Sequence, residues 1–477
     1  MSDRRDFIKQ TLAGGAAALF LQRLSSARAL ARASAPDEDP WARLPEILKR
    51  IKAPAFPSRD FDVTKYGAKG DGRVDNTEAI RKAVAACNRA GGGRVVVPAG
   101  VFLTGPVHLL SNVNLHVSVG ATLKFVQDPQ AYLPAVYTRW EGMELMSYSP
   151  FIYAFEQRNV AVTGKGTLDG NSDEKHWWPW KGQAQYGYQK GEPNQSKARA
   201  ALAEMVERGV PVAERVFGEG SYLRPQFVQP YRCQNVLIEG VSIVNSPMWE
   251  LNPVLCTNVI VRGVQIRSHG PNNDGCDPES CKDVLIEDCT FDTGDDCIAV
   301  KSGRNADGRR LHVPSENIVI RGCRMKDGHG GITIGSEISG GVRNLYADDC
   351  TMDSPNLETA LRFKNNAVRG GLLENIFFRN ITVGQVAHAV LTVDFNYEEG
   401  AKGKYTPVVR NLSVQNLKSG RSRLALDVQG FENAPVYDLR LKDCTFENVE
   451  RPAIVKNVSG LKLENVKVNG SVVDRLG

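Results

Sequence analysis

Four short polar segments gather the side chains of this 477-residue chain that could do acid–base chemistry. They are Asn272-Asn273-Asp274, Gly294-Asp295-Asp296, Gly328-His329-Gly330 and Arg362-Phe363-Lys364. The first three follow the second strand-like run in consecutive copies of an internal repeat. Equivalent positions of stacked strands lie about 4.8 Å apart, so we expect the three aspartates to converge, with His329 one coil further along. Arg362 and Lys364, two residues apart on a strand, would point the same way.

Three clustered carboxylates repel one another, which raises at least one pKa and leaves a protonated acid beside ionised neighbours. Glycoside hydrolysis needs those two states, because one carboxylic acid protonates the leaving oxygen while another carboxylate orders water or attacks carbon. The nearby His, Arg and Lys would hold an anionic sugar. Each segment alone also fits a turn or a solvated strand face. Their joint order on consecutive repeats favours catalysis.

The repeat predicts how these residues are positioned. Each copy has alternating β-branched residues, a Gly/Asn/Asp break and a second short strand, without room for a crossover helix. Leucine-rich repeats share the period but need a denser leucine pattern, so we predict an all-β fold, a right-handed parallel β-helix with one coil per repeat. Copies begin at Asn235, Asn258, Asp283, Asn317, Asn344, Asn375, Asn411, Asp438 and Gly460, at intervals of 23, 25, 34, 27, 31, 36, 27 and 22 residues.

The ends of a solenoid need covering. Asp75 and Glu78 resemble a capping box before the amphipathic stretch 79–85, which predicts an N-terminal capping helix. We therefore expect one β-helix catalytic domain over residues 60–477, with a loop-and-helix segment inserted around 176–225. Residues 30–59 would be a linker with a short helix around 44–52.

The overall composition excludes several classes of protein. With 42% hydrophobic and 24% charged residues the chain is not disordered, and no apolar stretch of about 18 residues exists to span a membrane. The formal charge is +5, but five basic and only two acidic residues lie within the first 29 positions. The remainder is nearly neutral, so bulk charge does not indicate a nucleic-acid partner.

Residues 1–29 have the layout of an export signal. A basic start precedes the apolar run 11–21 and a small-residue site at 27–29. The run around Arg4 and Arg5 resembles a twin-arginine motif, so we expect a periplasmic or secreted protein. An ordinary amphipathic terminal helix is the alternative.

The ten cysteines include no Cys-x-x-Cys pair and do not suggest zinc binding. Four of them recur at one position of the repeat, which predicts a stack of small buried side chains. Cys276 and Cys281 are close enough in sequence to bridge in an oxidising compartment. The recurring cysteines are Cys289, Cys323, Cys350 and Cys444.

The ordered set of four segments resembles the signature of glycoside hydrolase family 28, the polygalacturonases, which reads Asn-Thr-Asp, Gly-x-Asp-Asp, Gly-His-Gly and Arg-Ile-Lys. Asn273 and Phe363 depart from it, both outside the charged positions. Residues 66–72, which read Tyr-Gly-Ala-Lys-Gly-Asp-Gly, also resemble an early segment of the family, although other pectin-lyase-like β-helices share it. The resemblance therefore runs from about residue 60 to residue 470.

This resemblance implies inverting hydrolysis of α-1,4-galacturonosyl linkages in polygalacturonan or its oligosaccharides. It implies that Asp295 is the general acid, that Asp274 and Asp296 activate water, and that the Gly-His-Gly element favours homogalacturonan. It implies no metal or other cofactor, and we expect a monomer whose partner is the acidic polysaccharide. The implied catalytic residues are Asp274, Asp295, Asp296 and His329, and the implied substrate-binding residues are Asn272, Arg362, Lys364 and Tyr397.

The inserted segment bears on whether cleavage is internal or terminal. Its aromatic cluster, residues 176–180, could stack on sugars or could merely pack the insertion onto the body. Residues 137–142 also resemble exo-acting family members, so we favour exo action. A pectate lyase-type eliminase on the same fold and a non-catalytic polysaccharide-binding solenoid are the alternatives.

Overall fold

The computed structural model describes residues 39–476, which fall into two units. The first contributes only residues 39–43, with the 3₁₀ turn η1 (Pro40–Arg43). The second begins at Leu44 and contains every β-strand of the described chain. The export signal predicted over residues 1–29 lies outside the described residues.

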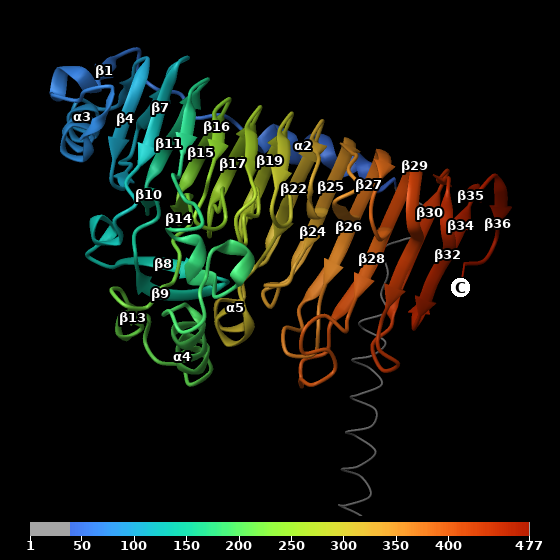
Figure 1. Cartoon of the computed structure of the whole chain (residues 1–477). Coiled ribbons are helices and arrows are strands. Elements are labelled where there is room, and N and C mark those ends of the chain that lie inside the picture. Colours follow the sequence, from blue (N-terminus) through green and yellow to red (C-terminus); the bar gives the residue numbers. More distant parts are fainter. Residues whose placement is uncertain (1–38, 477) are drawn as a thin grey trace, which may run out of the picture. The chain divides into compact units, whose positions relative to one another are not determined.

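The second unit is a right-handed parallel β-helix whose coils stack along one axis (Figure 1). Almost every strand pairs in parallel with its counterparts in the coils before and after it, as the sequence repeat predicts. The first strands of the main coils are β6 (Val113–Val117), β11 (Arg158–Gly164), β15 (Gln234–Glu239), β17 (Thr257–Arg262), β19 (Lys282–Glu287), β22 (Ser315–Arg321), β25 (Val342–Met352), β27 (Leu372–Gln385), β29 (Val408–Gln429), β30 (Val436–Lys442) and β34 (Lys462–Glu464).

Two further stacks of strands complete each coil. The second strands are β7 (Ala121–Phe125), β12 (Thr167–Asp169), β16 (Ser242–Val244), β18 (Gln265–Ser268), β20 (Thr290–Thr293), β23 (Arg324–Met325), β31 (Thr445–Phe446) and β35 (Val466–Val468). The third are β5 (Val107–His108), β10 (Ile152–Phe155), β14 (Val228–Tyr231), β21 (Ile298–Val300), β24 (Gly328–Ile334), β26 (Leu357–Lys364), β28 (Ala389–Asp394) and β32 (Val449–Lys456). β25 and β27 each run through a corner and serve two positions, and β29 is long enough to serve all three.

The strand register confirms the repeat intervals read from the sequence. Val236 pairs with Val259, Val259 with Val284, and Val284 with Ile318. The same position continues through Leu345, Ile376, Leu412 and Leu439. Because side chains alternate along a strand, this register keeps each apolar set inside the coil.

The residue that opens most repeats is asparagine for two physical reasons. The backbone there takes a left-handed conformation, with φ between 54° and 59° at Asn235, Asn258, Asn344 and Asn411, and asparagine tolerates this better than most residues. The amide side chains also hydrogen-bond to one another from coil to coil, for example Asn258 Nδ2 to Asn235 Oδ1 at 2.8 Å. Asn411 and Asn375 continue this asparagine ladder at 2.7 Å.

The cysteines fill the core instead of cross-linking it. All ten are free and buried, so the disulfide considered between Cys276 and Cys281 is not present. The two residues belong to different stacks: Cys281 Sγ accepts the Cys256 N–H at 3.4 Å, whereas the Cys276 position bridges to Leu251 and Ile298. The predicted stack at one repeat position is confirmed by the burial of Cys289, Cys323, Cys350 and Cys444.

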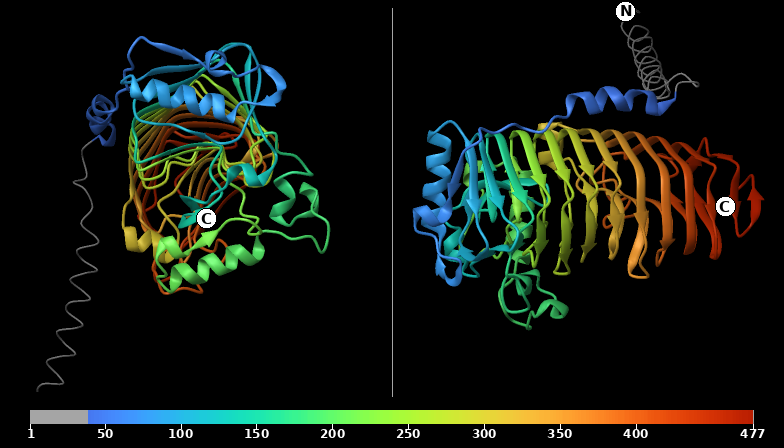
Figure 2. Two further views of the ribbon diagram at one scale, coloured as in Figure 1. Left: turned by 90° about the vertical axis from the view of Figure 1, so that its left-hand side faces the viewer. Right: turned by 90° about the horizontal axis from the view of Figure 1, so that it is seen from above.

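At the N-terminal end, α3 (Thr77–Arg89) lies across the first coils (Figure 2). The first coil contains β1 (Asp60–Asp62) and β2 (Asp71–Asp75), which pair in parallel with β3 (Gly93–Val97) and β4 (Gly100–Thr104) of the next. The apolar side chains of α3, including Ile80 and Val84, are buried. The capping geometry differs from a capping box. Asp75 Oδ1 accepts the Thr77 N–H at 2.9 Å, while Glu78 pairs with Arg81 instead of reaching back.

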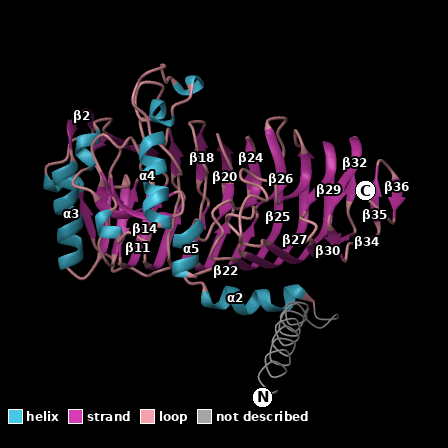
Figure 3. Cartoon of the chain, turned by 90° about the horizontal axis from the view of Figure 1, so that it is seen from below, coloured by secondary structure: helices cyan, strands magenta, loops and turns pink. Residues whose placement is uncertain are grey.

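A short helix, α2 (Leu44–Arg50), runs along the outside of the coils near β19 and β22 (Figure 3). It is attached where the asparagine ladder is interrupted by Asp283. Arg50 pairs with Asp283 at 2.8 Å, and Lys52 exchanges two backbone hydrogen bonds with the Asn258 amide at 2.8 and 2.9 Å. An aspartate in the ladder thus provides a binding point for this segment.

The inserted region forms a lobe on one flank of the coils (Figure 1). The indole of Trp177 is 2% exposed and packs edge-on against Tyr132 and Phe151, and Trp180 packs against Trp177 and Tyr222. For Trp177 the packing interpretation therefore holds and sugar stacking does not. The lobe contains the turns η4 (Trp178–Lys181), η5 (Ala184–Tyr186) and η6 (Val212–Glu214), helix α4 (Ser196–Glu207) and strand β13 (Val216–Phe217). Strands β8 (Val136–Trp140) and β9 (Met143–Ser147) form an antiparallel hairpin, and β13 pairs with β9.

The remaining elements are the turns η2 (Val63–Tyr66) and η3 (Pro129–Tyr132), helix α5 (Asn305–Leu311), and strands β33 (Val458–Ser459) and β36 (Ser471–Val473). Across the described part of the chain, no helix combines the length and the apolar character that crossing a bilayer requires.

Candidate active site

Consecutive coils bring the predicted site residues together. Asp274 follows β18, and Asp295 and Asp296 follow β20 in the next coil. Oxygen atoms of the three carboxylates all lie within 4.8 Å of one another. His329 on β24 comes from the following coil, and Arg362 and Lys364 on β26 from the one after that.

Asp296 is the central, fully buried carboxylate of the group. Its Oδ2 accepts from Lys364 Nζ at 2.5 Å and its Oδ1 from the Thr333 hydroxyl at 2.9 Å. Arg362 Nη1 lies 3.6 Å from Oδ1. Burial works against the charge of Lys364, but the Asp296 carboxylate outweighs it and raises the Lys364 pKa. Both oxygens of Asp296 are therefore committed to neighbouring groups.

Asp295 forms a charged pair with His329. The two side chains meet at 2.9 Å between Oδ1 and Nδ1. Burial favours the neutral acid, but the hydrogen bond and charge of His329 outweigh it, so the pKa of Asp295 falls below its usual range. The same hydrogen bond raises the pKa of His329 to about 9. In the unliganded protein, this proton resides on the imidazole.

Asp274 is the carboxyl that holds a proton of its own. It is buried, and burial together with the charge of Asp295 raises its pKa to about 8. One counter-charge, Lys301, lies 3.4 Å from its Oδ2. The group as a whole thus combines a neutral Asp274 with the ionised Asp295–His329 pair, which is the separation of protonation states that acid–base catalysis requires.

Lys301 and Arg224 are two charged residues at the site that lie outside the four sequence motifs. Lys301 follows the apolar strand β21 and lies 3.3 Å from Glu337 and 4.0 Å from Asp277 as well as near Asp274. These carboxylates raise the pKa of Lys301 although burial opposes the charge. The sequence signal that could have revealed Lys301 is a charged residue placed directly after the apolar run Ile298–Val300.

The four implied binding residues differ in what they contact. Lys364 is buried with its ammonium against Asp296, and the Tyr397 ring centre lies 5.4 Å from the same ammonium. Arg362 retains an 18% exposed side chain and donates to the His329 carbonyl at 3.1 Å. Asn272 reaches Asp295 Oδ2 with its amide nitrogen at 3.4 Å. Arg362 is therefore the cation of this set that is open to a ligand.

The donor set does not suit a divalent cation, although three carboxylates cluster here. A protein cation already lies beside each one: Lys301 beside Asp274, His329 beside Asp295, and Lys364 beside Asp296. A second cation would face those charges at close range. The site therefore differs from the calcium-binding cluster that an eliminase on this fold would need.

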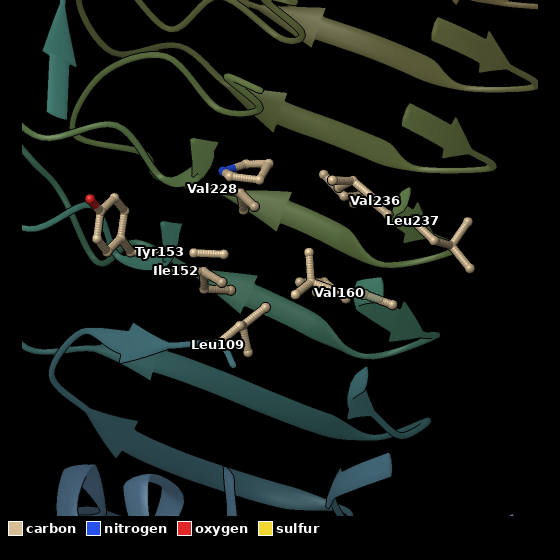
Figure 4. A pocket seen from close by; sticks show the side chains of 12 residues that line it. Leu109, Ile152, Tyr153, Val160, Val228, Val236 and Leu237 are labelled. Carbon is tan, nitrogen blue, oxygen red and sulfur yellow. The ribbon is translucent and has the colours of Figure 1, made fainter. Parts of the chain in front are cut away.

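A small apolar cavity of about 10 Å³ lies elsewhere, in the core (Figure 4). Its walls include Leu109, Ile152, Val160 and Val228, and none of the site aspartates lines it. It is a packing void of the coil interior and not a second binding site.

Comparison with protein-family models decides the classification. Residues 218–471, which contain all four motifs, match the model described as glycosyl hydrolases family 28. The chain belongs to this family. It is accordingly a glycoside hydrolase, and neither the eliminase nor the non-catalytic solenoid is favoured. Residues 61–122 match a second model, rhamnogalacturonase A/epimerase, pectate lyase-like, in line with the shared early segment.

Individual relatives agree with the family assignment. A probable polygalacturonase of Vitis vinifera is 28% identical over 417 residues, covering 84% of this chain and 77% of that protein. An exo-poly-alpha-D-galacturonosidase of Dickeya chrysanthemi is 27% identical, covering 79% of this chain and 65% of that protein. The solved structure of a hyperthermoactive exopolygalacturonase from Thermotoga maritima is 49% identical, with a TM-score of 0.89 over 92% of this chain and 98% of that one.

Proposed function

We propose that this glycoside hydrolase cleaves α-1,4-galacturonosyl linkages of polygalacturonan or its oligosaccharides, removing sugars from a chain end. The observation that carries the proposal is the trio Asp274, Asp295 and Asp296 with cations on either side. An acidic sugar chain suits a site where basic side chains surround the reacting carboxylates. The names of the Thermotoga and Dickeya relatives point to the same substrate and to terminal cleavage.

In the proposed reaction the Asp295–His329 pair supplies the proton. Asp295 protonates the glycosidic oxygen as the bond to the anomeric carbon breaks, and His329, 2.9 Å away, passes its proton to Asp295. Asp274 and Asp296 hold the attacking water, and the Asp296 carboxylate accepts one proton from it, because Asp274 already carries a proton. One water is consumed, and its atoms end on the two saturated products. Arg362 binds the carboxylate of the sugar that lies beyond Asp296.

We also propose that the anomeric configuration inverts. Carboxyl groups about 5–5.5 Å apart usually accompany retention and about 6.5–9.5 Å accompany inversion, so the spacing alone favours retention. The states of the two candidate nucleophiles oppose it. Asp274 has a pKa raised by burial, and both oxygens of Asp296 are engaged by Thr333 and Lys364. Proton NMR of the first product decides: the β-anomer is expected, and initial release of the α-anomer would contradict inversion.

Hydrolysis and elimination leave different products. We expect new reducing ends from polygalacturonan without an increase in absorbance at 235 nm, because hydrolysis creates no double bond. Absorbance that rises in step with the reducing ends would establish elimination and overturn the proposal. Addition of a chelator provides the control, since an eliminase that depends on calcium would stop and this hydrolase would not.

We further propose that the protein is exported through a twin-arginine signal and works as a monomer outside the cytoplasm. The basic start with Arg4 and Arg5 and the nearly neutral remainder of the chain support export. Replacing both arginines by lysine should retain the protein in the cytoplasm, and unchanged export would exclude this route. Light scattering during size exclusion should give the mass of one chain, and a multiple of it would exclude the monomer.

A further inference from the structure

Two cations of the inserted lobe converge on one neutral oxygen beside the catalytic acid. Lys181 Nζ donates to Asn272 Oδ1 at 2.7 Å, and Arg224 Nη2 donates to the same oxygen at 2.8 Å. The other hydrogen bonds of Arg224 end on the Gln195 side-chain oxygen at 3.2 Å and on the carbonyls of Pro247 and Pro271 at 2.8 and 2.5 Å. Every acceptor is uncharged.

Arg224 differs in this respect from the other fully buried arginines. Within residues 39–476, four arginines are among the largest completely buried side chains, and three of them have a carboxylate within 3.2 Å. Neither Arg224 nor Lys181 forms an ion pair with any residue in that range. The three paired examples are Arg139 with Glu279 at 3.2 Å, Arg215 with Asp307 at 2.6 Å and Arg369 with Glu398 at 2.8 Å.

Burying a charge without a counter-ion is costly, so such a pair of cations indicates that an anion binds there. Burial lowers the pKa of Arg224 to about 10, and burial together with the Arg224 charge lowers the pKa of Lys181. Arg224 is enclosed, whereas Lys181 is only partly buried and uses one of its three N–H groups on Asn272. Lys181 is therefore the residue that an anion can reach.

The lobe fixes this ammonium close to the reacting groups. The indole of Trp178 donates to the Ser246 carbonyl at 2.8 Å and lies on Gly270, where an added Cβ would be 2.3 Å from Trp178 Nε1. The Asn272 side chain accepts a hydrogen bond from Lys181, and its amide nitrogen lies 3.4 Å from Asp295 Oδ2. One amide side chain thus separates the ammonium from the catalytic carboxylate.

Lys181 and Arg362 lie on opposite sides of that carboxylate along the solenoid axis. Asn272 belongs to the coil before Asp295, while Arg362 belongs to a coil beyond His329. A galacturonate chain that crosses the site carries one carboxylate on each sugar, on both sides of the bond that is cut. Arg362 accounts for one side, and on the other side Lys181 and Arg224 offer positive charge that no carboxylate of the described residues meets in an ion pair, although Glu141 and Asp295 act on both from further away.

We infer that Lys181, positioned by Arg224 through Asn272, binds the carboxylate of the terminal galacturonate and makes the enzyme select an acidic chain end. This inference rests on the proposed function. Both cations belong to the inserted lobe or its edge. The inference therefore assigns the lobe a chemical role, which is to bind the charged carboxylate of the last sugar.

The test uses the full-length enzyme and two trisaccharides, trigalacturonate and the same trimer with the terminal non-reducing carboxyl reduced to a neutral alcohol. The wild type should prefer the acidic end. Lys181→Met should lower kcat/KM on trigalacturonate about 30-fold, chiefly through KM, and leave the reduced trimer within about twofold. Lys181→Arg should restore most of the preference, because it returns the charge.

Lys190→Met is the matched control, since Lys190 is an exposed lysine of the same lobe. A purely structural role for Lys181 would lower kcat/KM on both trimers equally, and that result overturns the inference. A Lys181→Met enzyme that prefers the acidic trimer as strongly as the Lys190→Met control also overturns it. If the wild type hydrolyses neither trimer, the proposed function itself fails, which is a separate outcome. Circular dichroism and the thermal midpoint verify that the variants are folded.

Discussion

At the scale of single residues, the site is a set of coupled charges more than a list of separate roles. The motif positions of Asp274, Asp295 and Asp296 were predictable because the repeat aligns them, and their side chains do meet. Which carboxyl carries the proton was not predictable, because it depends on burial and on His329, 2.9 Å from Asp295. Family resemblance assigns the acid to Asp295, and the structure adds the imidazole that holds its proton.

The protonation of Asp274 predicts that replacing this residue increases stability at high pH and removes activity. Its pKa is raised to about 8 in the folded protein, against about 3.9 in an unfolded chain. Stability from this group is therefore complete below about pH 4 and is lost as the pH rises through 8. Asp274→Asn is always neutral, so at pH 8 it should stabilise the protein by up to about 5 kcal/mol, the linkage that pKa values of 8 and 3.9 imply. Replacing the carboxyl that holds the attacking water should at the same time abolish turnover.

Thermal denaturation of the wild type and Asp274→Asn at pH 4 and pH 8 measures this difference. The midpoints should nearly coincide at pH 4 and separate at pH 8, with the variant higher. A variant midpoint at or below the wild type at pH 8 would show instead that Asp274 is ionised in the folded protein and compensated by Lys301.

His329 predicts the alkaline side of the activity profile. Its pKa is raised to about 9 by Asp295, so the proton-bearing pair is present below that pH and disappears as the pH rises through about 9. Its contribution to stability is complete below about pH 6.5, the ordinary histidine pKa, and is lost over the same interval up to 9. His329→Gln should lower kcat about 100-fold and remove this alkaline limb.

The measurement is kcat/KM on trigalacturonate from pH 5 to pH 10 for both proteins. His388→Gln is a control, since His388 pairs with Asp427 at 3.0 Å in a later coil and does not belong to the site. An unchanged alkaline limb in His329→Gln would assign that ionisation to another group.

At the scale of the elements, the repeat made the strands predictable and left the inserted lobe open. Alternating β-branched residues and the asparagine that opens most copies specify the register, which the pairing of Val236, Val259 and Val284 reproduces. The lobe has no repeat to guide a prediction, so the contacts of Lys181 and Arg224 emerged only from the structure. Tertiary packing of Trp177 likewise decided between two interpretations that the sequence could not separate.

The asparagine ladder gives an element-scale prediction. Asn344 has φ of 58°, donates to Asn317 and accepts from Asn375, both at 3.2 Å. Asn344→Ala loses these bonds and strains the left-handed backbone, whereas Asn344→Gly loses only the bonds. We expect alanine to cost about 2–3 kcal/mol and glycine about 1 kcal/mol less. Equal thermal midpoints for the two variants would show that backbone conformation is not what selects asparagine.

At the scale of the whole chain, function follows from where the coils and the lobe place charge. The net charge of +5 says little about the partner, because part of it lies in the first 29 residues. What matters is local: three carboxylates on adjacent coils, with Arg362 on one side and the Lys181–Arg224 pair on the other. This distribution assigns the two sides of the scissile bond different binding partners, and the lobe marks the terminal side.

The product profile of tri- to hexagalacturonate tests the central claim most directly. Chromatography of early time points should show galacturonate monomer together with each oligomer shortened by one sugar, all saturated, and Asp295→Asn should give none of these products. A ladder of mid-length oligomers at the earliest times would contradict terminal cleavage, and unsaturated oligomers would contradict hydrolysis by these carboxylates.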